Sequence, residues 1–511
     1  RGQYVNEEDG QSLILEEAST SDLTFSGQAH FDQNLGQDGK AHLTLSIQSP
    51  EIKADMLDTL WPASEDDNEE SIAHKWLVRR LNEGVYKNLN VTLSLQGTLP
   101  PEISVASIEN YSWSPNFEST KAALSFENMH VLYMDTLPPV EDASGDVTIE
   151  GKAMTVTIRS GNASGLNIKD GGILYFDDLV TKGSGTADLK FSLEGSLQSF
   201  FDYLKHEPIA IERRAGIPVE NIKGTSASEV HVTFPTIKEL KTEQVKVDTI
   251  ATISNVEIPN FLGNLSLRDG PYKIVASVED FTLSGKGFLG SAPIELDWHQ
   301  YVLEDLSSFP YESKAKIKTD VTLDLQKALG LDLTDYTDDA FPIELDYVAY
   351  ADGRSNIKGQ ANLKNITYGI DLFHVQKFEG RAATLNFDAM LDKDKKLSNV
   401  AFVKFLAPET DIQAKDLVFV PDHILPVSGI VEQFKIGKTE ASVQIAPKPT
   451  DAQGVMLDVA GRIVDAQGFI NKSKGGLKDT LPSLAIKLKA DQLLMKNDEI
   501  FTDTQLLYAQ N

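Results

Sequence analysis

Residues 42 to 48 read His-Leu-Thr-Leu-Ser-Ile-Gln, and apolar and polar side chains alternate through this stretch without a break. In an extended chain Leu43, Leu45 and Ile47 project from one face, and the polar residues between them project from the other. A helix would place its apolar residues three or four positions apart instead. The stretch is therefore predicted to be a β-strand with one apolar face.

The same alternation recurs along the whole chain, from Val91-Thr92-Leu93 through Leu189-Lys190-Phe191 to Leu484-Ala485-Ile486. Turn-forming pairs such as Asp352-Gly353 fall between the strand-like runs. Helical periodicity is rare between them, which favours antiparallel meanders over units that alternate strands with helices.

Two segments have the apolar spacing of a helix. Residues 69–83 place Ile72, Trp76 and Leu77 on one stripe before Gly84, and residues 196–206 do the same with Phe200 ahead of a proline. A third, weaker helix is predicted near residues 325–329. No linker composition separates domains, so residues 1–511 are predicted to form one continuous β-segment of a longer protein, with helical insertions near 69–83 and 196–206.

A sheet with one apolar face must bury that face. Two sheets can pack as a sandwich, one sheet can close as a barrel, or the face can line a groove that holds an apolar ligand. The lack of domain boundaries favours the groove: a mostly β, long, strongly twisted and curled antiparallel sheet that forms an elongated, taco-like apolar groove. The candidate lining residues are the alternating apolar ones, namely Leu43, Leu45, Ile47, Val91, Leu93, Leu95, Val156, Ile158, Leu189, Phe191, Leu193, Val232, Phe234, Val321, Leu323, Leu325, Leu385, Phe387, Val443 and Ile445.

Composition argues against several kinds of chemistry. The 511 residues carry a formal net charge of −29, which disfavours a nucleic-acid partner because phosphate binding needs clustered Lys and Arg. There is no cysteine, so disulfides, Cys-ligated metals and thiol catalysis are excluded. The nine histidines are scattered, and no catalytic residue, metal ligand or cofactor is predicted.

The glycine cluster from Gly285 to Gly290 is interpreted as a β-turn or bulge, because strand-like sequence flanks it on both sides.

Several ordered segments form a recognisable series: Leu60-Trp61-Pro62, residues 74–78 with Gly84, residues 137–145, residues 156–161, residues 285–298, Leu329 to Leu333 and residues 461–466. Together they resemble the AsmA-like superfamily, and in particular its YhdP branch of bacterial envelope proteins. One departure falls at residues 374–380, where the family often has a Gly-Trp-x-Lys-Pro stretch.

This resemblance implies a periplasmic fragment of a protein that an absent segment anchors in the inner membrane. Family members extend through the Gram-negative envelope as a curled sheet whose groove carries phospholipid acyl chains between inner and outer membrane. The implied partners are phospholipids, the inner membrane and outer-membrane or periplasmic proteins. No catalytic residues are carried over, and the protein is predicted not to be an enzyme.

Three hypotheses remain open from the sequence. The first is a bridge-like lipid-transfer protein for outer-membrane biogenesis. The second is a non-transporting structural or scaffold β-protein of the cell envelope with a dry apolar core, because alternation looks the same in both. The third, a polysaccharide-processing enzyme, predicts clustered aromatic residues, whereas the four tryptophans are dispersed.

Overall fold

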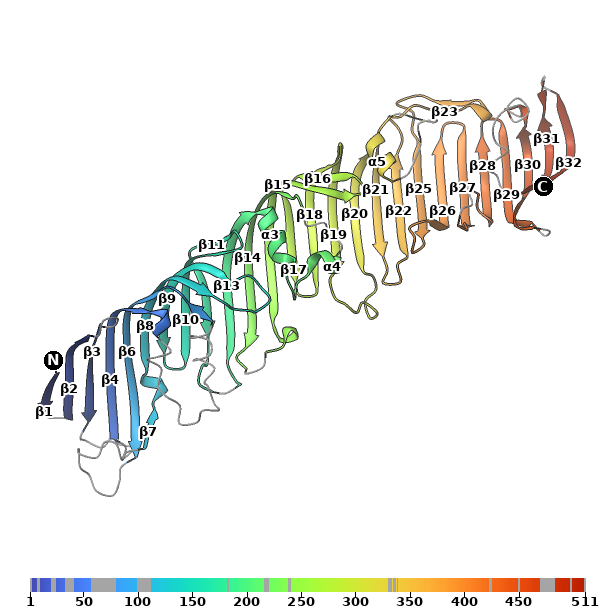
Figure 1. Ribbon diagram of the computed structural model, residues 1–511. Helices are drawn as coiled ribbons and strands as arrows, with labels where there is room; N and C mark the ends of the chain where they lie inside the picture. Colours follow the sequence, from blue (N-terminus) through green and yellow to red (C-terminus); the bar gives the residue numbers. More distant parts are fainter. Residues whose placement is uncertain are drawn as a thin grey trace. The chain divides into compact units, whose positions relative to one another are not determined.

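The computed structural model consists mostly of β-strands (Figure 1). It describes residues 2–6, 10–19, 24–32, 41–56, 80–98, 112–181, 183–215, 220–237, 240–329, 333, 337, 339–421, 425–448, 451–468, 483–496 and 499–509. Thirty strands belong to one hydrogen-bonded sheet, and β23 and β24 form a separate pair. The prediction of a mostly β fold with a few short helices is confirmed.

The chain divides into two units, each described here by itself. Unit 1 comprises residues 1–254 and 274–278, and unit 2 comprises residues 255–273 and 279–511. The division falls within two strands, β15 (Lys246–Leu262) and β17 (Tyr272–Ser277), rather than at a linker. That residues 1–511 form one continuous β-segment of a longer protein stays a prediction.

Unit 1 is a meander in which most strands pair with their neighbours in the sequence. The hydrogen-bonded order is β1-β2-β3-β4-β6-β8-β9-β10-β12-β13-β14, and each of these pairs is antiparallel. Short strands β5, β7 and β11 pair at the margins of this order. The strands are β1 (Gly2–Asn6), β2 (Gly10–Ser19), β3 (Thr24–Asp32), β4 (Ala41–Lys53), β5 (Leu81–Asn82), β6 (Val85–Thr98), β7 (Ser112–Pro115), β8 (Lys121–Val131), β9 (Val140–Glu150), β10 (Ala153–Ala163), β11 (Leu166–Ile168), β12 (Gly172–Phe176), β13 (Thr186–Ser196) and β14 (Lys223–Pro235).

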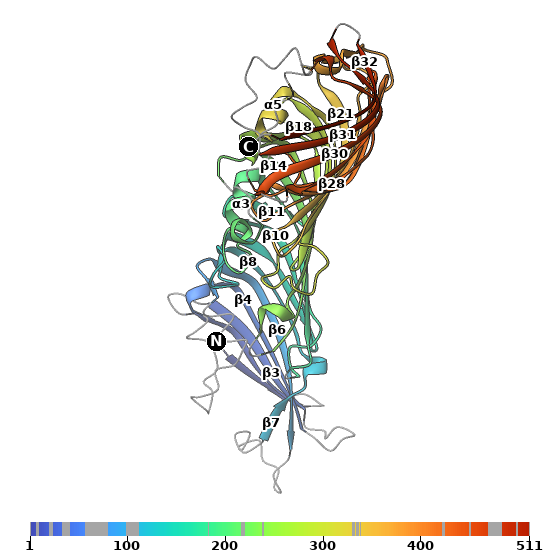
Figure 2. The ribbon, with the colours of Figure 1, turned by 90° about the vertical axis from the view of Figure 1, so that its right-hand side faces the viewer.

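Unit 2 continues the same pattern in the order β16-β18-β19-β20-β21-β22-β25-β26-β27-β28-β29-β30-β31-β32. Strands β21, β28, β30 and β31 curve along their length (Figure 2). The strands are β16 (Leu265–Asp269), β18 (Asp280–Leu289), β19 (Ala292–Tyr301), β20 (Ser313–Val321), β21 (Phe341–Ala349), β22 (Ser355–Asn362), β23 (Tyr368–Ile370), β24 (Val375–Lys377), β25 (Thr384–Leu391), β26 (Leu397–Ala407), β27 (Thr410–Val418), β28 (Ser428–Ile436), β29 (Thr439–Lys448), β30 (Asp451–Asp465), β31 (Leu484–Leu494) and β32 (Ile500–Ala509).

One strand pair corrects the prediction of an antiparallel sheet, because β30 and β31 run parallel. A parallel pair needs a crossover of about a dozen residues or more, and the chain between Asp465 and Leu484 is long enough to supply one. Alternation within a strand carries no information about its direction, so the sequence pattern could not distinguish the two cases.

The α-helices of the described residues are α3 (Leu197–Leu204), α4 (Ile211–Ala215) and α5 (Leu323–Ala328). Helix α3 confirms the insertion predicted near 196–206, and its N-cap Ser196 accepts a hydrogen bond from the Ser199 amide. Helix α4 was not predicted. Most of the helix predicted for residues 69–83 lies outside the described residues, and Leu81 and Asn82 at its end form β5 instead. The remaining short elements are 3-10 turns, η1 (Ala54–Met56), η3 (Phe117–Ser119), η4 (Thr242–Gln244) and η5 (Asp371–Phe373).

Candidate functional site: two apolar sheet faces

Cross-strand register aligns apolar side chains into a row in unit 1. Across β8, β9, β10, β12, β13 and β14 each member lies directly opposite the next, so all project from the same face. The same face continues over β3, β4 and β6, where Leu45 lies opposite Ala29 and Leu93. We call the six-residue set the unit 1 row: Leu124, Val147, Val156, Leu174, Leu189 and Val232.

Unit 2 carries a longer row of the same kind, which runs from β19 to β32. Its one glycine, Gly359, is covered by the ring of Phe387 on the next strand, and a Cβ at Gly359 would overlap that ring. An aromatic residue thus fills the place of the missing side chain. The unit 2 row consists of Leu296, Ile317, Leu345, Gly359, Phe387, Val403, Ala414, Val431, Val443, Val459, Leu488 and Leu506.

β-Bulges keep the apolar residues on one face where strict alternation fails. Phe126 and Met129 are three positions apart on β8, yet both pack in one apolar cluster with Tyr86. The register shifts between them, and Asn128 there has a φ of 55°. The extra residue of a bulge reverses the alternation, so the side chain beyond it returns to the same face. The sequence pattern missed these residues because it counted only period-two runs.

The candidate lining residues fall on these faces with two exceptions. All thirteen candidates from Leu43 to Phe234 lie on the apolar face of unit 1, and Val321, Leu385, Phe387, Val443 and Ile445 lie on that of unit 2. Leu323 and Leu325 do not, because β20 ends at Val321 and both residues belong to helix α5. Thr322 caps that helix by accepting a hydrogen bond from the Leu325 amide. The strand therefore ends before Leu323, although the alternation of apolar residues continues to Leu325.

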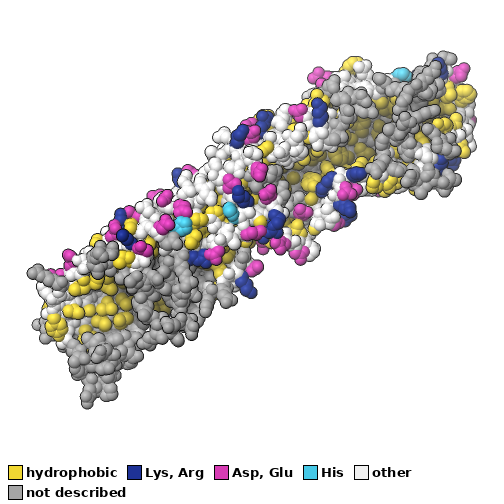
Figure 3. Space-filling view, viewed as in Figure 1, with side chains coloured by type: hydrophobic (Ala, Val, Ile, Leu, Met, Phe, Trp, Pro, Cys, Tyr) yellow, Lys and Arg dark blue, Asp and Glu magenta, His cyan; other side chains and the backbone are white. Residues whose placement is uncertain are grey.

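The two faces are only partly buried. Most members of both rows are half-buried, and others on the same faces are well exposed, including Leu13 (57%), Ile47 (44%) and Leu397 (39%). In the space-filling view, hydrophobic side chains gather over β2 to β6 in unit 1 and line a hollow over β21 to β27 in unit 2 (Figure 3). The faces therefore retain apolar surface that a ligand could cover.

The opposite face of each unit is charged. In unit 2, Lys318 pairs with Glu344 at 3.1 Å and Lys358 with Asp388 at 3.2 Å across neighbouring strands. In unit 1 His231 lies 3.0 Å from Asp188, and this hydrogen bond is the main cause that lowers the pKa of the Asp188 carboxyl. The part of the sheet in each unit is thus polar on one face and apolar on the other, as the alternation of residues predicts.

An inserted segment covers part of the apolar face in unit 1. Helix α3 packs on β13 and β14 (Figure 1), and its Leu197 and Phe201 are buried together with Leu166 and Ile222. The hydroxyl groups of Tyr203 on α3 and Tyr133 lie 2.7 Å apart. Desolvation raises the pKa of Tyr133, and the neighbouring Tyr203 raises it further.

In unit 2 the covering segment is residues 363–383, which contain η5 and the β23–β24 hairpin; we call it the strap. Its Leu363, Ile366 and Tyr368 form a buried cluster with Phe341 and Ala361 at the ends of β21 and β22. Where the strap and helix α3 pack, the residues of the apolar face are buried.

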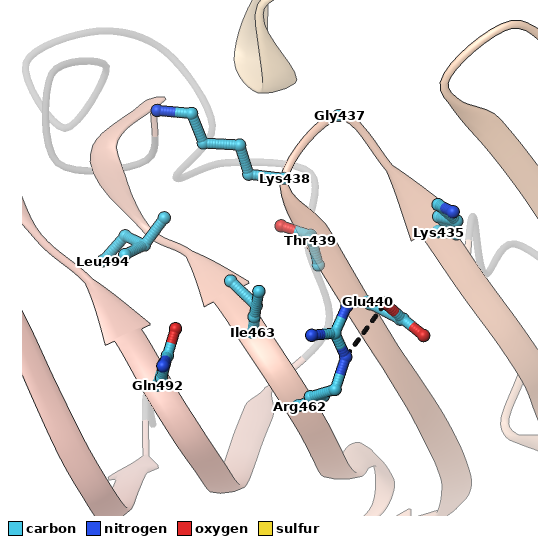
Figure 4. Close-up of a pocket in the computed structure, with 9 residues that line it drawn as sticks. All are labelled: Lys435, Gly437, Lys438, Thr439, Glu440, Arg462, Ile463, Gln492 and Leu494. Carbon is cyan, nitrogen blue, oxygen red and sulfur yellow. Dashed lines mark hydrogen bonds and ion pairs between the residues drawn. The ribbon is translucent and has the colours of Figure 1, made fainter.

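Two pockets of the described residues lie on the strands of the sheet. One of about 300 Å³ lies among β28 to β31, where Arg462 and Glu440 point toward each other as an ion pair (Figure 4). This pair lowers the pKa of Glu440. Within the described ranges, no three His, Cys, Asp or Glu side chains are grouped to hold a metal ion, and no helix is long and apolar enough to cross a membrane.

The glycine cluster lies in β18 and in the turn at Gly290, where it makes room for the buried ring of Tyr272.

Comparison with known proteins adds no assignment. The sequence matches no protein-family model and no curated protein.

Proposed function

We propose that the apolar faces of both units hold the acyl chains of phospholipids and that the protein transfers lipid without catalysing a reaction. The unit 2 row carries this proposal, because it runs from strand to strand over β19 to β32 and most of its members are only partly buried. Burying one methylene group of an acyl chain is worth about 0.8 kcal/mol, so a chain that covers this row would be held without a polar recognition site.

The segments that resemble the AsmA-like superfamily support a location for this activity. We place the protein in the Gram-negative periplasm, anchored in the inner membrane, as part of a lipid bridge toward the outer membrane with outer-membrane or periplasmic proteins as further partners. Fractionation of a tagged full-length protein tests this placement, and recovery in the cytoplasm would refute it.

The alternative is an envelope scaffold whose apolar faces are dry. The cores beneath the strap and helix α3 favour it, since they need no ligand. The two functions differ in what happens to the exposed part of each face: in a scaffold it stays empty, and in a lipid carrier it is occupied.

Neighbouring residues on β26 provide a matched test. Val403 belongs to the unit 2 row, whereas Phe402 projects from the opposite face and is 45% exposed. Leu174 and the 42% exposed Tyr175 form the same kind of pair in unit 1. We expect Val403→Asp and Leu174→Asp to lose co-purified phospholipid, measured by mass spectrometry, because each places a charge against the acyl chains.

The controls Phe402→Asp and Tyr175→Asp introduce the same charge on the polar face and should retain lipid. Circular dichroism establishes that all four variants keep their β-structure. Wild-type protein that carries no phospholipid after mild extraction, or equal lipid content in all four variants, would contradict the lipid-carrier function and leave the scaffold.

A further inference from the structure

The strap closes one edge of the apolar face of unit 2. It leaves the sheet after β22 and returns at β25, and between these points it reaches strands farther along the sheet. The ring of Tyr368 lies 5.8 Å from that of Phe405 near the end of β26, and the ring of Phe373 lies 5.6 Å from that of Phe434 near the end of β28. Figure 1 shows β23 running along the ends of these strands.

Polar contacts within the strap hold its own shape. The buried ammonium of Lys377 donates hydrogen bonds to the carbonyl oxygens of Lys364, Ile366 and Phe378 at 2.9, 2.6 and 3.3 Å. The Leu363 amide donates to the Ala383 carbonyl at 2.9 Å and closes the base of the strap. These bonds hold the segment in one shape. Its packing on Phe341, Phe405 and Phe434 places it at the edge of the hollow.

The opposite edge of the same strands is polar. The turns at residues 350–354 and 392–396 lie side by side there, and the Lys395 ammonium donates to the Gly353 carbonyl at 3.3 Å. They carry the cations Arg354, Lys393, Lys395 and Lys396 together with three aspartates. Figure 3 shows Lys, Arg, Asp and Glu side chains along this edge of the hollow.

Apolar residues lie at both ends of these strands. Ala361 at the strap edge is 0% exposed, and Leu397 at the turn edge is 39% exposed beside the buried Ser355. An eight-residue strand such as β25 spans about 26 Å, and one acyl layer of a bilayer is about 15 Å deep. A single acyl chain can therefore lie along the strands between the two edges.

We propose that the unit 2 face binds a phospholipid in one orientation, with its acyl chains directed toward the strap and its headgroup at the turns 350–354 and 392–396. The mixed charges of these turns suit a phosphate-containing headgroup, while the strap packs Ile366, Tyr368 and Phe373 against the other ends of the strands. This orientation rests on the proposed lipid-carrier function.

The absence of cysteine allows a positional test with single-cysteine variants. Leu397→Cys and Ala407→Cys place a fluorescent bimane label at the turn edge and the strap edge of one strand, β26, on the apolar face. Phe402→Cys places the control label on the polar face. Each labelled protein is loaded from vesicles of phosphatidylcholine brominated either near the ester or near the terminal methyl, because bromine quenches a nearby label.

The label at position 397 should be quenched more by ester-proximal bromine, and the label at position 407 more by methyl-proximal bromine, with little quenching at 402. An inverted order, or equal quenching of both inner labels by both lipids, overturns the orientation while lipid binding stands. No quenching at either inner label overturns lipid binding in unit 2 and the orientation with it.

Discussion

The side-chain ammonium of Lys377 donates a hydrogen bond of 2.6 Å to the main-chain carbonyl of Ile366, and both residues are buried in the strap. Lys377 is 1% exposed, and desolvation lowers its pKa, while the negative charges of Glu379 and Asp339 act in the opposite direction. Burying a lysine costs free energy unless its ammonium is fully hydrogen-bonded. Because Lys377 has three carbonyl partners, we identify it as the residue that holds the strap together.

Lys377→Met should loosen the strap without unfolding the sheet. The substitution leaves buried carbonyls without a donor, and we expect local opening of residues 363–383 to become easier by about 1–3 kcal/mol. Hydrogen exchange followed by mass spectrometry measures this change. Lys364→Met, at an exposed position in the same segment, is the control. Equal amide protection in both variants would contradict this role of Lys377.

The same residue predicts how the strap responds to pH. The folded pKa of Lys377 lies below the unfolded value of 10.5, so the unfolded segment binds more protons between the two values. Strap stability should therefore rise with pH as the medium passes the folded pKa, and level off above 10.5. The Met variant should lack this rise when exchange rates are corrected for their intrinsic pH dependence.

Gly287→Ala should destabilise unit 2, because a Cβ there would overlap the Tyr272 hydroxyl and the Arg268 carbonyl. Overpacking of this kind costs about 1–3 kcal/mol. Hydrogen exchange in β18 and β19 measures the loss. Lys286→Ala on the exposed side of the same strand is the control, and an unchanged Gly287→Ala variant would refute the close packing.

Tyr272 itself should make the structure sensitive to alkali. Burial raises its pKa to about 12 from the ordinary value of 10.0, and its hydroxyl donates to the Arg268 carbonyl at 3.0 Å. The folded state holds this proton more tightly, so the contribution is complete below pH 10 and is lost as the pH rises toward 12. Tyr272→Phe should remove that loss, which alkaline unfolding followed by circular dichroism can measure.

The hydrogen bond between Tyr133 and Tyr203 should hold helix α3 on the sheet of unit 1. Tyr133→Phe and Tyr203→Phe each remove it, and a double-mutant cycle should give a coupling of about 0.5–1.5 kcal/mol. Exchange rates of the α3 amides provide the measurement. Additive effects of the two substitutions would show that the hydroxyl groups do not interact.

The turn after β12 should keep its structure in mild acid and lose it only as the pH falls through about 2. The Asp178 carboxylate accepts hydrogen bonds from the amides of Thr181 and Val180 at 2.7 and 2.8 Å. Bonds from Thr181 are the largest cause that lowers its pKa to about 2 from 3.8. This stabilisation is present above pH 3.8 and is lost as the pH falls through about 2. Amide protection at residues 178–181 should show this acid loss in wild type and in Asp170→Asn, but not in Asp178→Asn.

Alternation of apolar and polar residues predicted most of the strands and which of their side chains share a face. Leu189 and Val232 each belong to such a run, and both lie in the unit 1 row. A period of two determines which side chains share a face, because successive residues of an extended chain point in opposite directions. The spacing of Leu197, Phe200 and Phe201 likewise predicted helix α3.

Only the tertiary structure decided which strands are neighbours and what covers their faces. The parallel pairing of β31 with β30 and the bulge that brings Phe126 and Met129 to one face depend on partners in other strands. The strap is the clearest case. Nothing in its sequence indicates that Lys377 is buried, because a lysine normally prefers water, and only three carbonyl groups brought together by folding satisfy it there.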